Sequence, residues 1–348
     1  MKNSLIDIRN LKKEELELFF TKNNSPKFRA SQVWDWIWKH RISDFEKMSN
    51  LSVNERELLK NSFIFNKTHI LRQETSVDGT VKFLFQLHDH EVVEGVLIPQ
   101  LNRLTACISS QVGCSLSCSF CATGKLKLSR NLTSGEIYDQ AFLINQFCIQ
   151  KFKKIITNVV FMGMGEPLLN IKNVLKSITH ISSSQGMGMS TKRITLSTVG
   201  IPKIIKKIAD INPKINLAIS LHAANNIKRT NIMPINQTND LNKLLDSLIY
   251  FYNKTKIKPT YEYVLLNGVN DSITDAKALV SFCKKNPSKV NLIEYNVVKG
   301  IPHEKSTHKN TIRFIEFLEK NNVLVKLRKS RGEDIGAACG QLATQIKE

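Results

Sequence analysis

The sequence predicts an α/β fold built on a parallel sheet that is closed or partly closed into a barrel. From residue 104 onward, short apolar runs with strand character alternate with segments of helical period. The connections between them are mostly short, which is typical of repeated β/α units. In addition, chemically unusual residues follow several of the expected strands, at the edge where the active sites of such barrels lie.

Residues 1–72 are predicted to form a small helical accessory domain. Apolar residues recur at helical spacing in three stretches, 12–20, 28–38 and 51–63. All three tryptophans lie in the second stretch, where Trp34 and Trp38 are four residues apart and share one helix face. We interpret Trp34, Ile37 and Trp38 as core residues in preference to a base-stacking surface. The basic residues of these helices suit the domain to docking RNA.

Residues 73–99 are predicted to form a β-meander that links this domain to the barrel. Apolar residues alternate over 81–87 and again over 92–98, and turn signals separate the two runs. Glu94 lies in the second run. A carboxylate in an apolar strand usually faces outward, so the pattern alone gives Glu94 little functional weight.

Residues 100–348 are predicted to form the barrel. Strands are expected at 104–110, 158–162, 193–197, 215–221, 260–265, 290–297 and 323–327. Helices are expected at 134–150, 171–181, 202–209, 241–252, 274–285 and 311–318. Thr133 and Glu136 have the spacing of a capping box, and Pro202 suits the first turn of a helix.

Cys114, Cys118 and Cys121 form a C-x₃-C-x₂-C pattern that directly follows the first expected barrel strand. An ordinary four-iron cluster has four thiolate ligands, so three thiolates leave one iron open. An open iron can bind the amino and carboxylate groups of S-adenosylmethionine and pass it an electron. The spacing is the signature of the radical-SAM superfamily, which the sequence resembles here.

A zinc site, a disulfide framework and chance each fit the three cysteines less well than an open-iron cluster. A structural zinc site needs a second pair of ligands, and the sequence offers none at the usual spacing. A disulfide framework belongs to small secreted chains with an even cysteine count, whereas this chain has 348 residues and seven cysteines. The three residues can also be unrelated small core residues.

The composition favours a polyanionic partner. The net charge is +20, from 50 Lys and Arg against 30 Asp and Glu, which points first to nucleic acid. Compositional drift toward Lys, Asn and Ile is the alternative, and it would scatter the charge. We expect no membrane association, because no apolar run approaches about 18 residues. The first 20 residues lack a signal sequence, so we expect a cytoplasmic protein, where a reduced cluster persists.

Further motifs at the expected strand ends predict a pocket for S-adenosylmethionine. Gly163, Gly165 and Glu166 follow the second strand, and glycine turns let backbone carbonyls approach an ammonium group. Polar side chains that can bind a ribose or a carboxylate end other strands: Ser197, Ser220, His222 and Asn296. Singly, each has a structural explanation, such as a plain turn at Gly-Glu-Pro or a core role for His222.

The segment 331–342 follows the last strand and is predicted to be a mobile loop at the same face. It contains three glycines, and Cys339 stands between small residues, so its sulfur is expected to be accessible. The upstream Arg328 and its basic neighbours are expected to contact phosphates. Cys107 lies in the strand that feeds the cluster loop. The remaining two cysteines, Cys148 and Cys283, are interpreted as core.

Together these motifs resemble the RlmN family, the radical-SAM adenine C2 methyltransferases of ribosomal and transfer RNA. The resemblance extends from about residue 28 to residue 342 and rests on five segments, 107–114, 114–124, 163–170, 220–223 and 337–342. It implies a radical-SAM partial (β/α)6 TIM-like barrel with a [4Fe-4S] cluster on Cys114, Cys118 and Cys121. The residues that it aligns with S-adenosylmethionine contacts are Gly165, Glu166, Ser197, Ser220, Leu221, His222 and Asn296.

The resemblance also implies a ping-pong radical mechanism that uses two S-adenosylmethionine molecules per turnover. Cys339 takes the methyl group of the first molecule. The second yields a radical that removes hydrogen from this methyl group, and the methylene radical adds to C2 of adenine. Cys107 then releases the RNA by forming a transient disulfide with Cys339, and Glu94 aligns with the family's proton acceptor.

The implied substrates are an adenosine of 23S rRNA near the peptidyl transferase centre and the tRNA adenosine 3′ of the anticodon. A monomer with a flavodoxin-type electron donor is the corresponding expectation. Two alternatives stay open. The first is C8 adenine methylation, which the related Cfr enzymes carry out with the same cysteines. The second is a basic RNA-binding protein that has the same fold but no catalytic activity.

Overall fold

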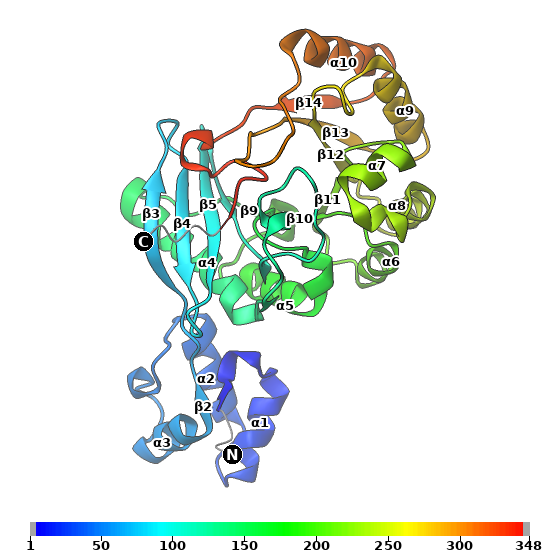
Figure 1. Ribbon diagram of the computed structural model, residues 1–348. Helices are drawn as coiled ribbons and strands as arrows, with labels where there is room; N and C mark the ends of the chain where they lie inside the picture. The colour runs from blue at the N-terminus through cyan, green and yellow to red at the C-terminus, as the bar shows by residue number, and fades with distance from the viewer. Residues whose placement is uncertain (1–4, 344–348) are drawn as a thin grey trace.

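A single ten-stranded sheet dominates the computed structural model, which describes residues 5–343 (Figure 1). Residues 1–4 of the predicted accessory domain and residues 344–348 of the predicted barrel segment therefore lie outside the described residues. The strand order is β14-β13-β12-β11-β10-β9-β6-β5-β4-β3. These strands are β3 (His69–Thr75), β4 (Val81–Gln86), β5 (Val92–Gln100), β6 (Arg103–Cys107), β9 (Asn158–Phe161), β10 (Ile194–Thr198), β11 (Asn216–Ser220), β12 (Thr260–Leu265), β13 (Lys289–Glu294) and β14 (Val325–Arg328).

Seven strands of the described chain, β6 and β9 to β14, run parallel to one another. β14 lies at one edge of the sheet and β3 at the other, so the barrel is only partly closed. The predicted α/β class and partial barrel are therefore confirmed. Because parallel strands place all their carboxyl ends on one side, the loops that follow them meet at a common face.

Helices follow the barrel strands, and the longer ones cover the outer face of the sheet (Figure 1). They are α4 (Ser134–Phe152), α5 (Ile171–Ser182), α6 (Pro202–Ile211), α7 (Asn226–Ile232), α8 (Leu241–Thr255), α9 (Ile273–Lys284) and α10 (His308–Lys320). The capping box at Thr133 and Glu136 is confirmed, as is Pro202 in the first turn of α6. α7 was not predicted, because seven mainly polar residues are too few to display a helical period.

The N-terminal region contains α1 (Lys13–Lys22), α2 (Phe28–Trp38) and α3 (Val53–Ser62), as predicted. It also contains a parallel pair of two-residue strands, β1 (Ile6–Asp7) and β2 (Phe63–Ile64), which are too short to be predicted. Trp38 is 1% exposed and stacks on His180 of α5 with ring centroids 3.5 Å apart. The core interpretation of Trp38 is confirmed, and this core is shared with the barrel.

The predicted meander is present as β3, β4 and β5, which are antiparallel, and it starts at His69. β5 pairs with β6, so the meander continues the barrel sheet and is not a free connection. Glu94 is only 4% exposed, and the expectation that it faces outward is wrong. The C-terminal segment covers this part of the meander, where Lys82 donates a 2.6 Å hydrogen bond to the carbonyl of Ile335.

Candidate active site

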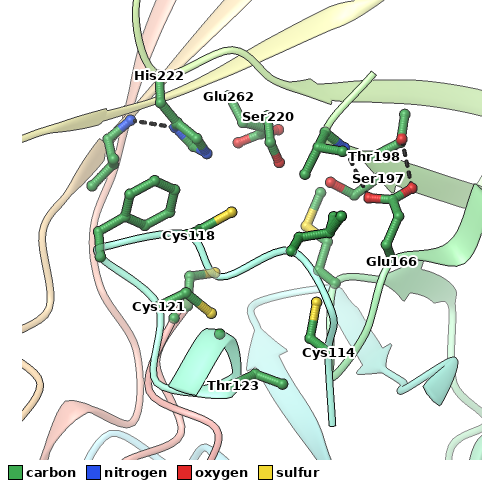
Figure 2. A pocket seen from close by; sticks show the side chains of 18 of the residues that line it. Cys114, Cys118, Cys121, Thr123, Glu166, Ser197, Thr198, Ser220, His222 and Glu262 are labelled. Carbon is green, nitrogen blue, oxygen red and sulfur yellow. Dashed lines mark hydrogen bonds between the residues drawn. The ribbon is translucent and has the colours of Figure 1, made fainter. Parts of the chain in front are cut away.

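A cavity opens at the carboxyl ends of the parallel strands, and the three cysteines of the C-x₃-C-x₂-C motif line it. In Figure 2 the sulfur atoms of Cys114, Cys118 and Cys121 lie on one side of the cavity. Ser220, Glu262 and other residues of the strand ends face them from the opposite side. Cys339 and Gly340 of the C-terminal segment also line this cavity. Segments more than 200 residues apart in the sequence therefore meet at one place.

The donor chemistry of the three cysteines fits a cluster site. Burial raises the pKa of Cys114 to about 11, and it raises the pKa of Cys118 and Cys121 as well. Thiols in this setting form thiolates readily only when a cation compensates the charge. Among residues 5–343, no three His, Cys, Asp or Glu side chains converge as ligands of one ion. Cluster thiolates stand farther apart, because each binds a different iron.

Backbone contacts hold the cysteine loop from both sides. The Ser119 amide donates to the carbonyl of Ile232 at the end of α7 (2.9 Å). The Ala122 amide donates to the carbonyl of Gly340 (2.7 Å). The hydroxyl of Thr123 donates to the carbonyl of Leu342 (2.6 Å). The loop is thus attached both to the barrel and to the segment that carries Cys339.

The glycine turn after β9 lies against the strand that feeds the cysteine loop. Gly165 has φ +90°, and a Cβ atom there would come within 2.4 Å of the Gln111 side chain, so only glycine fits. The next residue, Glu166, accepts hydrogen bonds from the Thr198 hydroxyl (2.6 Å) and the Val199 amide (2.9 Å). Burial raises the pKa of Glu166. Its carboxyl group connects the ends of β9 and β10 (Figure 2).

Ser197, Ser220 and His222 line the cavity, as the sequence predicts. The Nδ1 atom of His222 accepts a hydrogen bond from the Val264 amide (3.0 Å), which leaves the proton of the neutral ring on Nε2. Burial lowers the pKa of His222 to about 3, so the ring is neutral at physiological pH. A neutral donor suits contacts with carbonyl, ribose or adenine acceptors.

Two of the predicted contact residues border the cavity without lining it. Leu221 is fully buried, and its carbonyl accepts a hydrogen bond from the Nε atom of Arg229 (3.1 Å). Asn296 donates from Nδ2 to the carbonyl of Cys339 (3.1 Å), and its Oδ1 atom has no partner among the described residues. Asn296 therefore positions the loop of Cys339 and keeps one acceptor free for a ligand.

Two charged residues around the site, Glu262 and Arg229, were not predicted, and a third, Arg328, was predicted with a different partner. Glu262, on β12, lines the cavity, and its charge inside an apolar strand is the signal that could have identified it. Arg328 lies 3.5 Å from Glu262 and 3.8 Å from the Cys339 sulfur, so it faces the cavity and its expected phosphate contact is revised. Arg229 of α7 is fully buried and binds the strand-end carbonyls of Val199 (2.6 Å) and Leu221.

Of the three predicted reactive residues, Cys339 lines this cavity, and Cys107 and Glu94 lie next to it. Cys107 ends β6 and is buried, and burial raises the pKa of its thiol to about 12. Cys339 is exposed, which confirms the predicted accessibility of its sulfur. Glu94 lines a neighbouring cavity, and its carboxylate lies 3.8 Å from the ammonium group of Lys82. Burial raises the pKa of Glu94 as well.

Two family models match the chain: the ribosomal RNA large subunit methyltransferase N-terminal domain over residues 6–64, and the radical SAM superfamily over residues 108–279. The probable dual-specificity RNA methyltransferase RlmN of Christiangramia forsetii is 49% identical over 97% of this chain and 96% of its own length. The chain belongs to the RlmN family. The dual-specificity RNA methyltransferase RlmN of Desulfotalea psychrophila is 41% identical over 97% of the chain and 95% of its own length.

A solved structure agrees with this membership of the RlmN family. The crystal structure of a radical SAM methyltransferase from Sphaerobacter thermophilus superposes with a TM-score of 0.90 at 33% identity, covering 98% of this chain and all of the other. The fold that the two proteins share therefore includes the N-terminal region as well as the barrel. Within residues 5–343, no helix is long and apolar enough to cross a bilayer.

Proposed function

We propose that this chain methylates C2 of adenosine in 23S rRNA and in tRNA by a radical mechanism with S-methylcysteine as the methyl carrier. The observation that carries the proposal is that Cys339 lines the same cavity as Cys114, Cys118 and Cys121. A cavity of this kind lets one thiol meet both the methyl donor and the radical source. Membership of the RlmN family supplies the RNA substrates, and the net charge of +20 favours them.

The three cysteines would hold a [4Fe-4S] cluster, which, when bound, supplies the electron that cleaves S-adenosylmethionine to a 5′-deoxyadenosyl radical. The protein's own part is to bind and orient S-adenosylmethionine. Ser197, Ser220 and His222 face the cysteines across the cavity and are assigned to this task, together with the turn at Gly165 and Glu166. Leu221 and Asn296 are assigned to the border of the S-adenosylmethionine site.

Cys339 has the chemical role of methyl carrier. In the first step its sulfur forms a bond to the methyl carbon while the donor's sulfonium–methyl bond breaks, leaving S-adenosylhomocysteine. In the second step the 5′-deoxyadenosyl radical takes one hydrogen atom from the carrier methyl group, which gives 5′-deoxyadenosine, and the methyl carbon joins adenine C2. C2 has little nucleophilic character, so a radical route is required. This cycle uses two S-adenosylmethionine molecules.

Release of the RNA is assigned to Cys107 and Glu94. The thiol of Cys107 is close enough to Cys339 for the two sulfurs to influence each other electrostatically. Attack by the Cys107 thiolate on the Cys339 sulfur would form the S–S bond while the bond from that sulfur to the new carbon breaks. The carbon would take up a proton to become the methyl group of the base, and the unpaired electron of the adduct would return to the cluster. Glu94 would accept the C2 proton, because its carboxylate is buried beside Lys82 and one of its oxygens has no partner among the described residues.

We also propose that the protein acts in the cytoplasm as a monomer and receives electrons from a flavodoxin-type donor. Seven thiols without a disulfide among the described cysteines are compatible with a reducing compartment. The donor and the oligomeric state rest on what the family leads us to expect.

Nucleoside mass spectrometry tests the proposed reaction. The protein is reconstituted anaerobically with iron and sulfide, and is given S-adenosylmethionine, reductant and unmodified rRNA or tRNA. We expect 2-methyladenosine from both RNAs. A product methylated at C8 would replace the proposal with Cfr-type chemistry. Absence of both methylation and S-adenosylmethionine cleavage would favour the non-catalytic RNA-binding alternative.

A further inference from the structure

A second cavity, of about 630 Å³, lies beside the one that contains the cysteines. Four segments enclose it: the meander strands β3 to β5, the turn after Cys121, the loop after β13 and the C-terminal segment. Ala122 and Gln341 line this cavity, whereas Cys121 and Gly340, their sequence neighbours, line the first one. The two cavities therefore share a wall, and the loop of Cys339 is part of it. Figure 1 shows the segment after β14, in red, reaching from the barrel to the meander.

Basic residues from three of these segments stand at the rim of the second cavity. Arg72, Lys125 and Lys299 are exposed and line it. Within the described part of the chain, Lys125 and Lys299 form no ion pair, and Lys125 donates only to the carbonyl of Gly300. Arg72 pairs with Glu74 at 2.8 Å. Two of the three rim charges thus have no carboxylate partner, which leaves them available to an anion.

The interior of the same cavity has a different chemistry. Glu94 is 4% exposed, and its Oε2 atom has no hydrogen-bond partner among residues 5–343. Lys82 is occupied, because it binds Glu74 (3.6 Å), Glu94 (3.8 Å) and the carbonyl of Ile335 (2.6 Å). A buried acceptor without a partner is unusual in a folded protein and points to a ligand group that reaches it. The part of the ligand that reaches Glu94 has to be polar, and the parts of the ligand that bind the basic rim residues have to be anionic.

We propose that this cavity receives the RNA strand around the target adenosine, with backbone phosphates on Arg72, Lys125 and Lys299 and the base directed toward Glu94. A nucleotide combines the two required chemistries, an anionic backbone and an uncharged polar base, in one unit. The inference rests on the proposed function. It adds the entry route: RNA arrives on one side of the shared wall, S-adenosylmethionine lies on the other, and Cys339 stands between them.

Binding of unmodified tRNA transcript at several salt concentrations tests this assignment. The test variant is Arg72→Gln/Lys125→Gln/Lys299→Gln. The control variant, Lys258→Gln/Lys284→Gln/Lys320→Gln, removes the same charge from exposed residues that precede β12 or end α9 and α10, at the opposite end of the barrel. Each phosphate contact with single-stranded nucleic acid adds about 0.7 to the salt slope of log K. We therefore expect the slope of the test variant to fall by about 2 and its affinity at 0.15 M salt to fall by about ten-fold or more.

The control variant should keep the wild-type slope. Iron content and the mass of the Cys339 peptide, which should show one added methyl group in both variants, report whether the first cavity is intact. If the triple variant folds poorly, Lys299→Gln alone remains informative, with an expected slope decrease of about 0.7. Equal RNA binding by test and control variants would overturn the inference. It would also be overturned if the test variant bound RNA normally and lost only the binding of an acidic electron donor. Failure of wild-type protein to form 2-methyladenosine would instead contradict the proposed function.

Discussion

The Nη2 atom of Arg328 lies 3.8 Å from the sulfur of Cys339, and Nη1 of the same guanidinium lies 3.5 Å from Glu262. A cation held in this way stabilises negative charge on the sulfur, which is the nucleophilic form of cysteine. The interaction also raises the pKa of Arg328, so this side chain stays charged. Arg328 is thus a positioning residue for the methyl-accepting thiol.

Replacing Arg328 by Met should slow methylation of Cys339 by about ten-fold or more, because about 1.4 kcal/mol of lost stabilisation corresponds to a factor of ten. The time course of Cys339 peptide mass after addition of S-adenosylmethionine measures this step. Arg328→Lys should recover part of the rate. Lys326→Met, on the same strand but exposed, is the matched control and should behave as wild type. A wild-type rate in Arg328→Met would contradict the role.

Cys107→Ala should leave protein covalently attached to RNA after one turnover, because the thiol assigned to release is absent. Denaturing gel electrophoresis with labelled tRNA should show a slowly migrating band that nuclease removes. Cys148→Ala is a control, since Cys148 is also buried but lies in α4 and not at the end of β6. Normal release of methylated RNA by the Cys107 variant would remove its role as the resolving thiol.

Arg229→Met should destabilise the protein by roughly 3 kcal/mol, because it leaves buried carbonyl groups without their donor. The guanidinium binds the carbonyls of Val199 (2.6 Å) and Leu221 (3.1 Å) and the side chain of Asn236 (2.8 Å). Urea unfolding followed by circular dichroism measures the loss. Arg313→Met, an exposed residue of α10, should change the free energy of unfolding by no more than about 0.5 kcal/mol. Equal stability of the two variants would contradict the structural role.

Much of the fold follows from local sequence patterns. The sequence predicts β12 at its observed bounds, and the capping box of Thr133 and Glu136 marks the start of α4, because both signals are local. β1, β2 and α7 could not be predicted, because each is too short for a strand or helix period to be recognised in its sequence. The burial of Glu94 is not predictable locally, since the segment that covers it lies about 240 residues further along the chain.

Part of the site is also predictable, because some of its signals are local in the sequence. Cysteine spacing and strand-end motifs are local signals, so many residues that line the first cavity can be named from the sequence. The contact of Arg328 with Cys339 and Glu262 depends on how β12, β14 and the C-terminal segment come together. No local pattern encodes that arrangement.

The central claim is that the methyl group on Cys339 becomes the methyl group of the RNA, and isotope transfer tests it most directly. Cys339 is first methylated with S-adenosyl-[methyl-²H₃]methionine, and the excess donor is removed. One turnover is then run with unlabelled S-adenosylmethionine, reductant and RNA. The account predicts 2-methyladenosine that carries two deuterium atoms, with the third transferred to 5′-deoxyadenosine. A methyladenosine without deuterium would show that the methyl group bypasses Cys339 and would contradict the account.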